Sequence, residues 1–117
     1  MQLEERLVGD VAVVTVTGEI TLKKGHNGLL HDRVRNLVQQ GHTQVLVNLA
    51  GVSYVDSAGL GELVQTHSML KNHGGSMKLA NAKPRFRELL ALTRLTALFG
   101  IYDDEAQALA SFGSTNS

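Results

Sequence analysis

Short apolar runs alternate with amphipathic segments along most of this chain, and that alternation restricts the fold more than any other feature. Apolar runs at 44–50, 77–80 and 98–102 are each followed by a segment with apolar residues at helical spacing. Strands that alternate with helices form a sheet with parallel neighbours, because each helix returns the chain to the same end of the sheet. The sequence therefore predicts a single α/β domain.

The N-terminal segment predicts an antiparallel hairpin ahead of these units. Residues 3–8 and 11–17 are typical of strands, and Gly9-Asp10 between them suits a tight two-residue turn. Gly18 is expected to end the second strand, and residues 19–27 are expected to form a loop. The complete predicted order is ββαβαβαβα, a small mixed β-sheet with helices packed against it.

Capping residues, glycines and one proline mark the predicted helix ends. Asn27 suits an N-cap for the first helix, and Gly41 suits its C-terminal stop. The run NHGGS stops the second helix, and Pro84 suits the first turn of the third. An acidic run from residue 103 favours the start of a closing helix. We expect one domain over residues 1–112, followed by a disordered tail over 113–117.

The composition excludes several classes of protein and site. Hydrophobic residues make up 43% of the 117 residues, which suits a packed core and not a disordered chain. The absence of cysteine excludes a disulfide framework, a Cys-ligated zinc site and a thiol nucleophile. The first ten residues contain no apolar signal region, and no run is long enough to span a bilayer. We therefore expect a cytoplasmic protein without membrane insertion.

The charge balance argues against direct contact with nucleic acid. Eleven basic and eleven acidic residues give a formal net charge of zero, whereas nucleic-acid-binding domains usually carry a basic excess. Basic residues concentrate only at Lys83, Arg85, Arg87 and Arg94. Two interpretations of this cluster stay open, a solvated helix face and a contact with an acidic partner.

The stretch YVDSAGLGELVQTH raises the question of catalysis, since it places a serine between a strand and a helix. Ser57 and Gly59 match the second half of the Gly-x-Ser-x-Gly elbow of hydrolases, but Val55 replaces the first glycine. That elbow also requires an acid and then a histidine later in the chain. His73 is the last histidine, and none follows the acidic pair at 103–104. A triad in that order cannot be built.

Cofactor and metal sites find no support either. Gly59 and Gly61 match part of a dinucleotide-binding fingerprint, but Val64 replaces its third glycine. The histidines lack a compact metal-ligand pattern, and His67 falls on the apolar stripe of a helix, as a core-edge residue would. The five histidines are His26, His31, His42, His67 and His73. We expect no metal, no cofactor and no enzymatic activity.

The same stretch is suited to a phosphorylation switch. Ser57 is expected at or near the N-cap of a helix, where its hydroxyl can satisfy a free amide of the first turn. A phosphate there would meet backbone amides and the positive end of the helix dipole, and would add about 1.5 to 2 negative charges beside Asp56. A partner fitted to a small, neutral surface would then be repelled.

Two interpretations explain why glycines occupy this helix start, although each costs roughly 1 kcal/mol relative to alanine. Ala58, Gly59 and Gly61 present little side-chain bulk, so a kinase or another partner could approach the backbone closely. Alternatively, the glycines let the helix pack tightly against the sheet. The sequence leaves both open.

On these residues the sequence resembles the anti-sigma-factor antagonist family, whose fold is the sulphate-transporter and anti-sigma-factor antagonist (STAS) domain. The resemblance covers roughly residues 3–112. Its most specific part is Asp-Ser-x-Gly-Leu-Gly after an apolar strand and Asn-Leu. The carrying segments are VTVTGEI, VLVNLAGVSYVDSAGLGELV, NHGGSMKLAN and LLALTRLTALFGIYDDEAQAL.

The resemblance implies a regulatory phosphoprotein of bacterial transcription. In the family, the serine that matches Ser57 is phosphorylated by an anti-sigma factor with a Bergerat-type ATP-binding kinase fold. The unphosphorylated form binds that kinase and frees a sigma factor, and a PP2C-type phosphatase reverses the modification. The chain is thus expected to be a kinase substrate, and its zero net charge, which gives no strong self-repulsion, is compatible with a monomer or weak dimer. The implied partner-binding residues are Glu19, Thr21, Asp56, Ser57, Ala58, Gly59 and Gly61.

Two departures from the family pattern bear on this assignment. Thr21 stands where members commonly have an aspartate, which leaves two expectations open, recognition by a different kinase and poor phosphorylation of this chain. Ala58 stands where many members have a second serine, which leaves Ser57 as the hydroxyl of the motif. Lys23-Lys24 changes the charge of the same loop. The alternative function is a non-phosphorylated STAS interaction module in a sensory or transport assembly.

Overall fold

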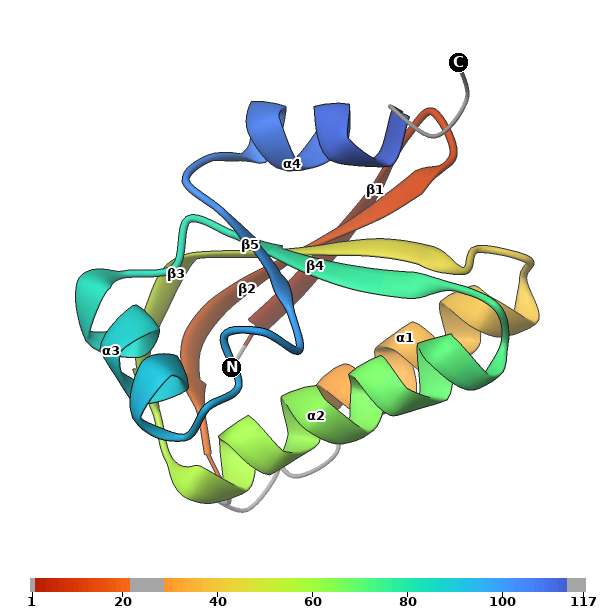
Figure 1. The fold of residues 1–117 in the computed structure, drawn as a ribbon. Helices are drawn as coiled ribbons and strands as arrows, with labels where there is room; N and C mark the ends of the chain where they lie inside the picture. Colours follow the sequence, from red (N-terminus) through yellow and green to blue (C-terminus); the bar gives the residue numbers. More distant parts are fainter. Residues whose placement is uncertain (1, 22–28, 114–117) are drawn as a thin grey trace.

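The computed structural model describes residues 2–21 and 29–113, and its elements follow the predicted order. The strands form one mixed sheet in the order β1-β2-β3-β4-β5, in which β1 is antiparallel to β2 and the other neighbours are parallel (Figure 1). The strands are β1 (Gln2–Val8), β2 (Val11–Ile20), β3 (Gln44–Val55), β4 (Ser76–Ala80) and β5 (Gly100–Tyr102). The helices are α1 (Leu29–Gln39), α2 (Ser57–Asn72), α3 (Pro84–Leu92) and α4 (Glu105–Gly113).

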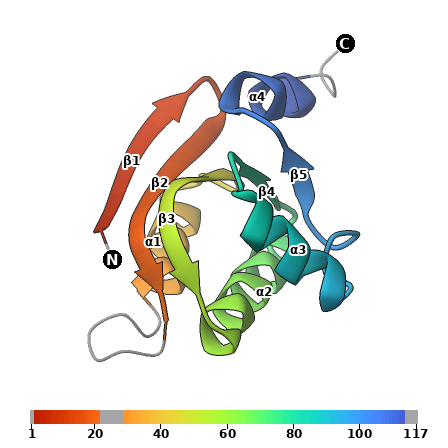
Figure 2. The same ribbon diagram turned by 90° about the vertical axis from the view of Figure 1, so that its left-hand side faces the viewer.

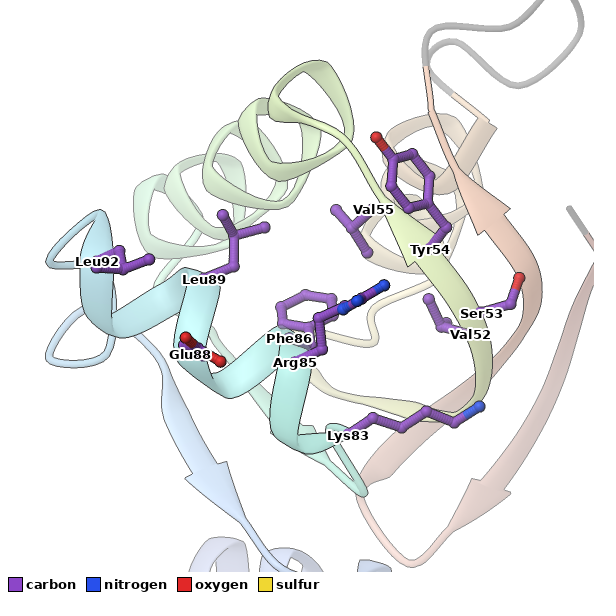
Figure 3. A pocket seen from close by; sticks show the side chains of 10 residues that line it. All are labelled: Val52, Ser53, Tyr54, Val55, Lys83, Arg85, Phe86, Glu88, Leu89 and Leu92. Atoms are coloured by element: carbon purple, nitrogen blue, oxygen red, sulfur yellow. The ribbon is translucent and has the colours of Figure 1, made fainter.

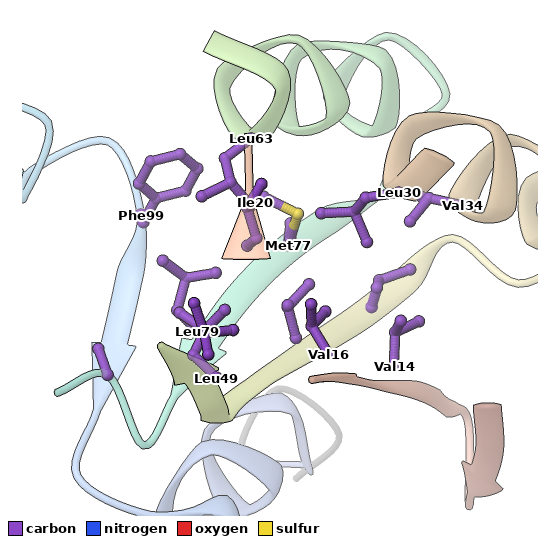
Figure 4. Close-up of a cluster of buried hydrophobic side chains, with 14 of the residues drawn as sticks. Val14, Val16, Ile20, Leu30, Val34, Leu49, Leu63, Met77, Leu79 and Phe99 are labelled. Atoms are coloured by element: carbon purple, nitrogen blue, oxygen red, sulfur yellow. The ribbon is translucent and has the colours of Figure 1, made fainter. Parts of the chain in front are cut away.

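Helices cover both faces of the sheet. Helices α1, α2 and α3 lie on one side and α4 lies on the other (Figures 1 and 2). Strand β2 is buried on both faces, because Val14 and Val16 point into the larger core while Val11 and Val13 point toward α4. Figure 4 shows Val14 and Val16 beneath side chains of α1 and α2 in the larger core. This core fixes the helix layer that carries the candidate site.

The predicted hairpin is confirmed, but its second strand is longer than expected. Val8 pairs with Val11, and Gly9 has a φ of +59°, as the first position of a type II′ turn requires. The prediction that Gly18 ends β2 is wrong, since the strand continues to Ile20. The pairing register of β2 with β3 shifts on both sides of Gly18, between Thr15 and Thr17 and between Gly18 and Glu19. These irregularities in the ladder allow the strand to continue past the glycine.

The predicted helix ends are largely confirmed. Gly41 follows α1 with a φ of +96°, and Pro84 is the first residue of α3. The predicted N-cap Asn27 lies outside the described residues, as do residues 114–117 of the expected tail. Across the described ranges, no helix is long and apolar enough to cross a membrane.

The N-terminus of α1 is satisfied from another helix, which the sequence did not predict. The carboxylate of Glu62 accepts the backbone N–H of His31 at 2.9 Å. Glu62 is buried on α2, and His31 lies in the first turn of α1. Amides of a first turn lack partners within their own helix, so this contact joins the two helix starts.

Asn48 marks the point where β3 separates from β4. The two strands pair only as far as Asn48 and Ala80, while β3 continues beside β2 to Val55. The side-chain oxygen of Asn48 accepts the N–H of Ala50 at 3.0 Å and a side-chain N–H of Asn81 at 3.2 Å. Its amide nitrogen donates to Glu105 of α4 at 2.7 Å. One side chain therefore ties together β3, α4 and the segment that follows β4.

Asn48→Asp is expected to reduce the free energy of unfolding by about 1–3 kcal/mol, because a carboxylate cannot donate to Glu105 and is repelled by it. Urea unfolding at neutral pH measures the loss. Asn36→Asp, an exposed change on α1, is the control and should alter stability by less than about 0.5 kcal/mol. Equal losses in the two variants would contradict the role of Asn48.

His67 is a buried core-edge residue, as predicted. Its side chain lies on α2 with the ring edge-on to Phe99, the two centroids being 5.4 Å apart. His67 is 6% exposed. Burial, and secondly the positive charge of Lys71, lower the pKa of His67 below 6.5. The unfolded chain therefore binds a proton at this histidine more readily than the folded chain does.

This difference predicts that His67 destabilises the fold progressively as the pH falls below about 6.5. Above that pH the histidine is neutral in both states and contributes no pH dependence. We expect the stability of His67→Phe, relative to the native chain, to increase between pH 7.5 and pH 5.5. Urea unfolding at both pH values tests this, and a constant stability difference would contradict it.

Candidate functional site

Ser57 lies at the junction where β3 turns into α2, exposed on the surface. The N-cap of α2 is Asp56, whose carboxylate accepts the N–H of Gly59 at 2.7 Å. Ser57 therefore lies next to the N-cap, within the expected position, but the side-chain capping bond comes from Asp56 and not from the Ser57 hydroxyl. Both residue types cap helices well, and the extended backbone of Asp56 (φ −96°, ψ 179°) places it in the capping position. Ser57 is the first helical residue, and its hydroxyl does not form the capping hydrogen bond.

The two glycines of the motif have different roles. A Cβ atom on Gly59 would lie 2.0 Å from the carbonyl oxygen of Ile20, so only glycine allows this approach. The packing interpretation is therefore correct for Gly59. A Cβ atom on Gly61 would meet nothing within 4 Å. Successive helical residues are about 100° apart, so two glycines separated by one residue face different directions.

The ends of β2 and β3 bring the other predicted partner-binding residues to the same edge of the sheet. Glu19 lies opposite Tyr54 in the β2–β3 ladder, and Ile20 lies opposite Val55. The N–H of Asp56 donates to the carbonyl of Ile20 at 3.3 Å. Glu19 and Thr21 therefore lie beside the start of α2.

Exposure distinguishes the two hydroxyl side chains at this edge. Thr21 is 5% exposed, whereas Ser57 and Ala58 are exposed. A kinase must reach the hydroxyl that it modifies, so the folded chain presents Ser57 and not Thr21. Lys23 and Lys24 of the same predicted loop lie outside the described residues.

Among residues 2–21 and 29–113, no group of three histidine or acidic side chains could hold a metal ion. His67 lies in the core and His73 follows the last residue of α2, so neither lies beside Ser57 at the opposite end of that helix. The site therefore consists of a surface hydroxyl, a capping carboxylate and small residues.

An open groove adjoins the site, and the sequence did not predict it. It lies between the C-terminal part of β3 and helix α3, with a volume of about 590 Å³ (Figure 3). We call it the β3–α3 groove. Its lining residues are Val52, Ser53, Tyr54, Val55, Lys83, Arg85, Phe86, Glu88, Leu89 and Leu92. The available sequence signal was the basic cluster around α3, although its Arg87 instead pairs with Asp103 at 2.8 Å.

The amino-acid sequence is similar to known STAS domains and anti-sigma factor antagonists. A family model described as the STAS domain matches residues 2–108. An anti-sigma-B factor antagonist of Bacillus subtilis (strain 168) is 36% identical to this chain over 88 residues. That alignment covers 75% of this chain and 78% of the relative.

Solved structures share the fold. An anti-sigma factor antagonist from Mycobacterium paratuberculosis superposes with a TM-score of 0.80 at 24% identity, covering 94% of this chain and 92% of the other. The Bacillus cell fate determinant SpoIIAA in its phosphorylated form superposes with a TM-score of 0.73 at 19% identity, covering 95% and 99%. At these identities the likeness is one of fold, including a five-stranded mixed sheet with helices on both faces.

Alanine substitutions at the two glycines should change stability in opposite directions. Gly59→Ala should lower the free energy of unfolding by about 1–3 kcal/mol, because the new methyl group collides with the backbone of Ile20. Gly61→Ala should raise it by up to about 1 kcal/mol, because alanine favours the helix and meets open space. Urea unfolding of both variants measures the effects, and a loss of stability in Gly61→Ala would refute this assignment.

Proposed function

The chain belongs to the STAS domain family, among its anti-sigma factor antagonists, and we propose that it is a binding switch controlled by phosphorylation of Ser57. The observation that carries the proposal is the exposed hydroxyl of Ser57 on the first residue of α2, beside the capping carboxylate of Asp56. The residues Ala58 and Gly61 that follow the serine are small and uncharged.

Phosphorylation would change that surface electrostatically. A phosphate on Ser57 adds about 1.5 to 2 negative charges. The Asp56 carboxylate lies on the neighbouring residue and Glu19 lies at the same sheet edge. Three acidic groups would then share one small area, and a partner surface fitted to the unphosphorylated state would face uncompensated negative charge and a steric clash. The added charge thus gives a physical reason for release of the partner.

The resemblance to anti-sigma factor antagonists supplies the partners of this proposed switch. The unphosphorylated chain binds an anti-sigma factor that is also the serine kinase, with a Bergerat-type ATPase fold, and thereby frees a sigma factor. A PP2C-type phosphatase regenerates the binding form. The chain itself is a kinase substrate without catalysis of its own, and it regulates transcription by exchange of partners. The phosphorylated form in which SpoIIAA has been solved supports this comparison.

At Thr21, the surface proposed to contact the kinase differs from the common family pattern. It is uncharged and buried where members commonly have an aspartate. The acidic residues that remain near Ser57 are Glu19 and Asp56, and Asp56 is engaged as the helix cap. The kinase therefore meets less negative charge here than the common family pattern presents.

Substitutions at Ser57 test the switch. Ser57→Ala should bind the kinase with native affinity and keep binding in the presence of ATP, because no phosphate can form. Ser57→Glu should bind at least about tenfold more weakly, because the interface must then bury an uncompensated negative charge beside Asp56. Calorimetry with the purified kinase measures both affinities, and mass spectrometry of the chain from its native cells checks for phosphate on Ser57.

Ser68→Glu is the matched control, since it makes the same change at an exposed serine elsewhere on α2. It should bind as the native chain does. Equal affinities for Ser57→Ala and Ser57→Glu would refute the switch. An unmodified Ser57 under all growth and stress conditions, with stable co-purification of a membrane or scaffold protein, would favour the alternative interaction module.

A further inference from the structure

We propose that the β3–α3 groove docks an acidic, apolar segment of the kinase that phosphorylates Ser57. This inference rests on the proposed function and adds the chemistry of the partner's contact. Three features of the groove support it. They are a partly exposed apolar lining, two cations at one end that have no ion-pair partner among the described residues, and a direct connection along β3 to the serine.

The lining presents apolar side chains to water. Tyr54 is 50% exposed and Leu92 is 77% exposed, whereas Leu89 is partly buried and Phe86, at 6% exposed, belongs to the core beneath the groove (Figure 3). The groove exists because β3 continues beyond Asn48 without β4 beside it. Exposed apolar surface of this kind marks interaction sites. An open groove suits a polypeptide segment better than a small ligand, which proteins usually enclose.

The charges at the N-terminal end of α3 indicate an acidic occupant. Lys83 is the N-cap residue of α3 and makes no side-chain capping bond, and Arg85 lies in the first turn. Within the part of the chain that the structure describes, neither side chain forms an ion pair, whereas Arg87 pairs with Asp103. In Figure 3 both side chains extend from α3 toward β3.

The placement of these two cations is unfavourable for the isolated helix. A helix N-terminus carries a partial positive charge that favours acidic residues, yet the first turn of α3 contains none. Glu88 also lines the groove, but it lies one turn further along. An acidic segment in the groove would neutralise Lys83 and Arg85 and interact favourably with the helix dipole. A local charge arrangement that opposes the fold is expected where a binding site requires it.

The groove is continuous with the phosphorylation site. Tyr54 and Val55 line it, and the next residues along the chain are Asp56 and Ser57. A kinase that reaches Ser57 would therefore cover this end of the groove. An acidic segment there would also be repelled by a phosphate on Ser57. The same contact thus promotes binding before phosphorylation and release after it.

Photocrosslinking identifies the occupant directly. A photoreactive amino acid at Leu92 in the full chain, expressed in its native cells, should crosslink to a segment rich in acidic and apolar residues within the kinase. The same probe at Leu7, which is 58% exposed on β1, is the control and should not capture that segment. A basic segment, a second copy of this chain, or no crosslink beyond the control would overturn the proposal.

Charge reversal then tests the chemistry. Lys83→Glu combined with Arg85→Glu should weaken binding of the purified kinase about tenfold and reduce the salt dependence of binding. The melting temperature should stay the same or rise, because acidic residues suit the first turn of a helix. Lys71→Glu reverses a charge at the other end of α2 and should leave the affinity unchanged.

The outcomes separate this proposal from the proposed function. Native affinity in the double variant, with Ser57 still phosphorylated, would overturn the groove assignment and leave the switch intact. The switch itself would be overturned by two results together: no phosphate on Ser57 of the native chain, and equal affinities of Ser57→Ala and Ser57→Glu for the kinase. The groove is supported as a docking site if the double variant binds the kinase more weakly at normal thermal stability. Lys71→Glu should then bind the kinase with native affinity.

Discussion

The close contact between helix α2 and backbone carbonyls of the sheet edges determines much of this structure. At the N-terminal end of α2, Gly59 packs on the carbonyl of Ile20, and a Cβ atom would lie 2.0 Å from that oxygen. Just beyond its C-terminal end, Gly75 packs on the carbonyl of Thr43 at the same Cβ distance. Both ends of the helix are therefore held against the layer beneath, which fixes where Ser57 meets solvent.

This anchoring separates structural from functional demands within one motif. Asp56 caps the helix and Gly59 sets its distance from the sheet, so both are required by the fold. The fold does not require Ser57, Ala58 or Gly61 in the same way. A partner could contact these three residues without disturbing the packing. A modification at Ser57 can therefore change the surface while the helix start keeps its geometry.

The zero net charge of the chain conceals a local imbalance. Within residues 2–21 and 29–113, four arginines form ion pairs with acidic side chains, namely Arg6 with Glu105, Arg33 with Glu5, Arg35 with Asp32, and Arg87 with Asp103. Lys83 and Arg85 form none with the described residues, and they line the groove that adjoins the phosphorylation site. Exposed ion pairs contribute little to stability, so the arrangement matters more for the choice of partner than for the fold.

The sequence alone determined the element order, the hairpin and the location of the serine motif. These depend on local periodicity, turn residues and caps, which act over a few neighbouring positions. The sequence did not predict the extension of β2 to Ile20, because pairing with β3 decides where that strand ends. It also did not predict Asp56 as the capping side chain, because Asp56 and Ser57 both suit an N-cap and the backbone geometry decides between them.

Only the tertiary structure separated Gly59 from Gly61 and formed the β3–α3 groove. Gly59 meets a strand that ended almost forty positions earlier, and the groove opens because β4 stops pairing at Ala80 while β3 continues to Val55. Contacts between such distant segments depend on how the elements pack in space, which no local pattern of residues specifies.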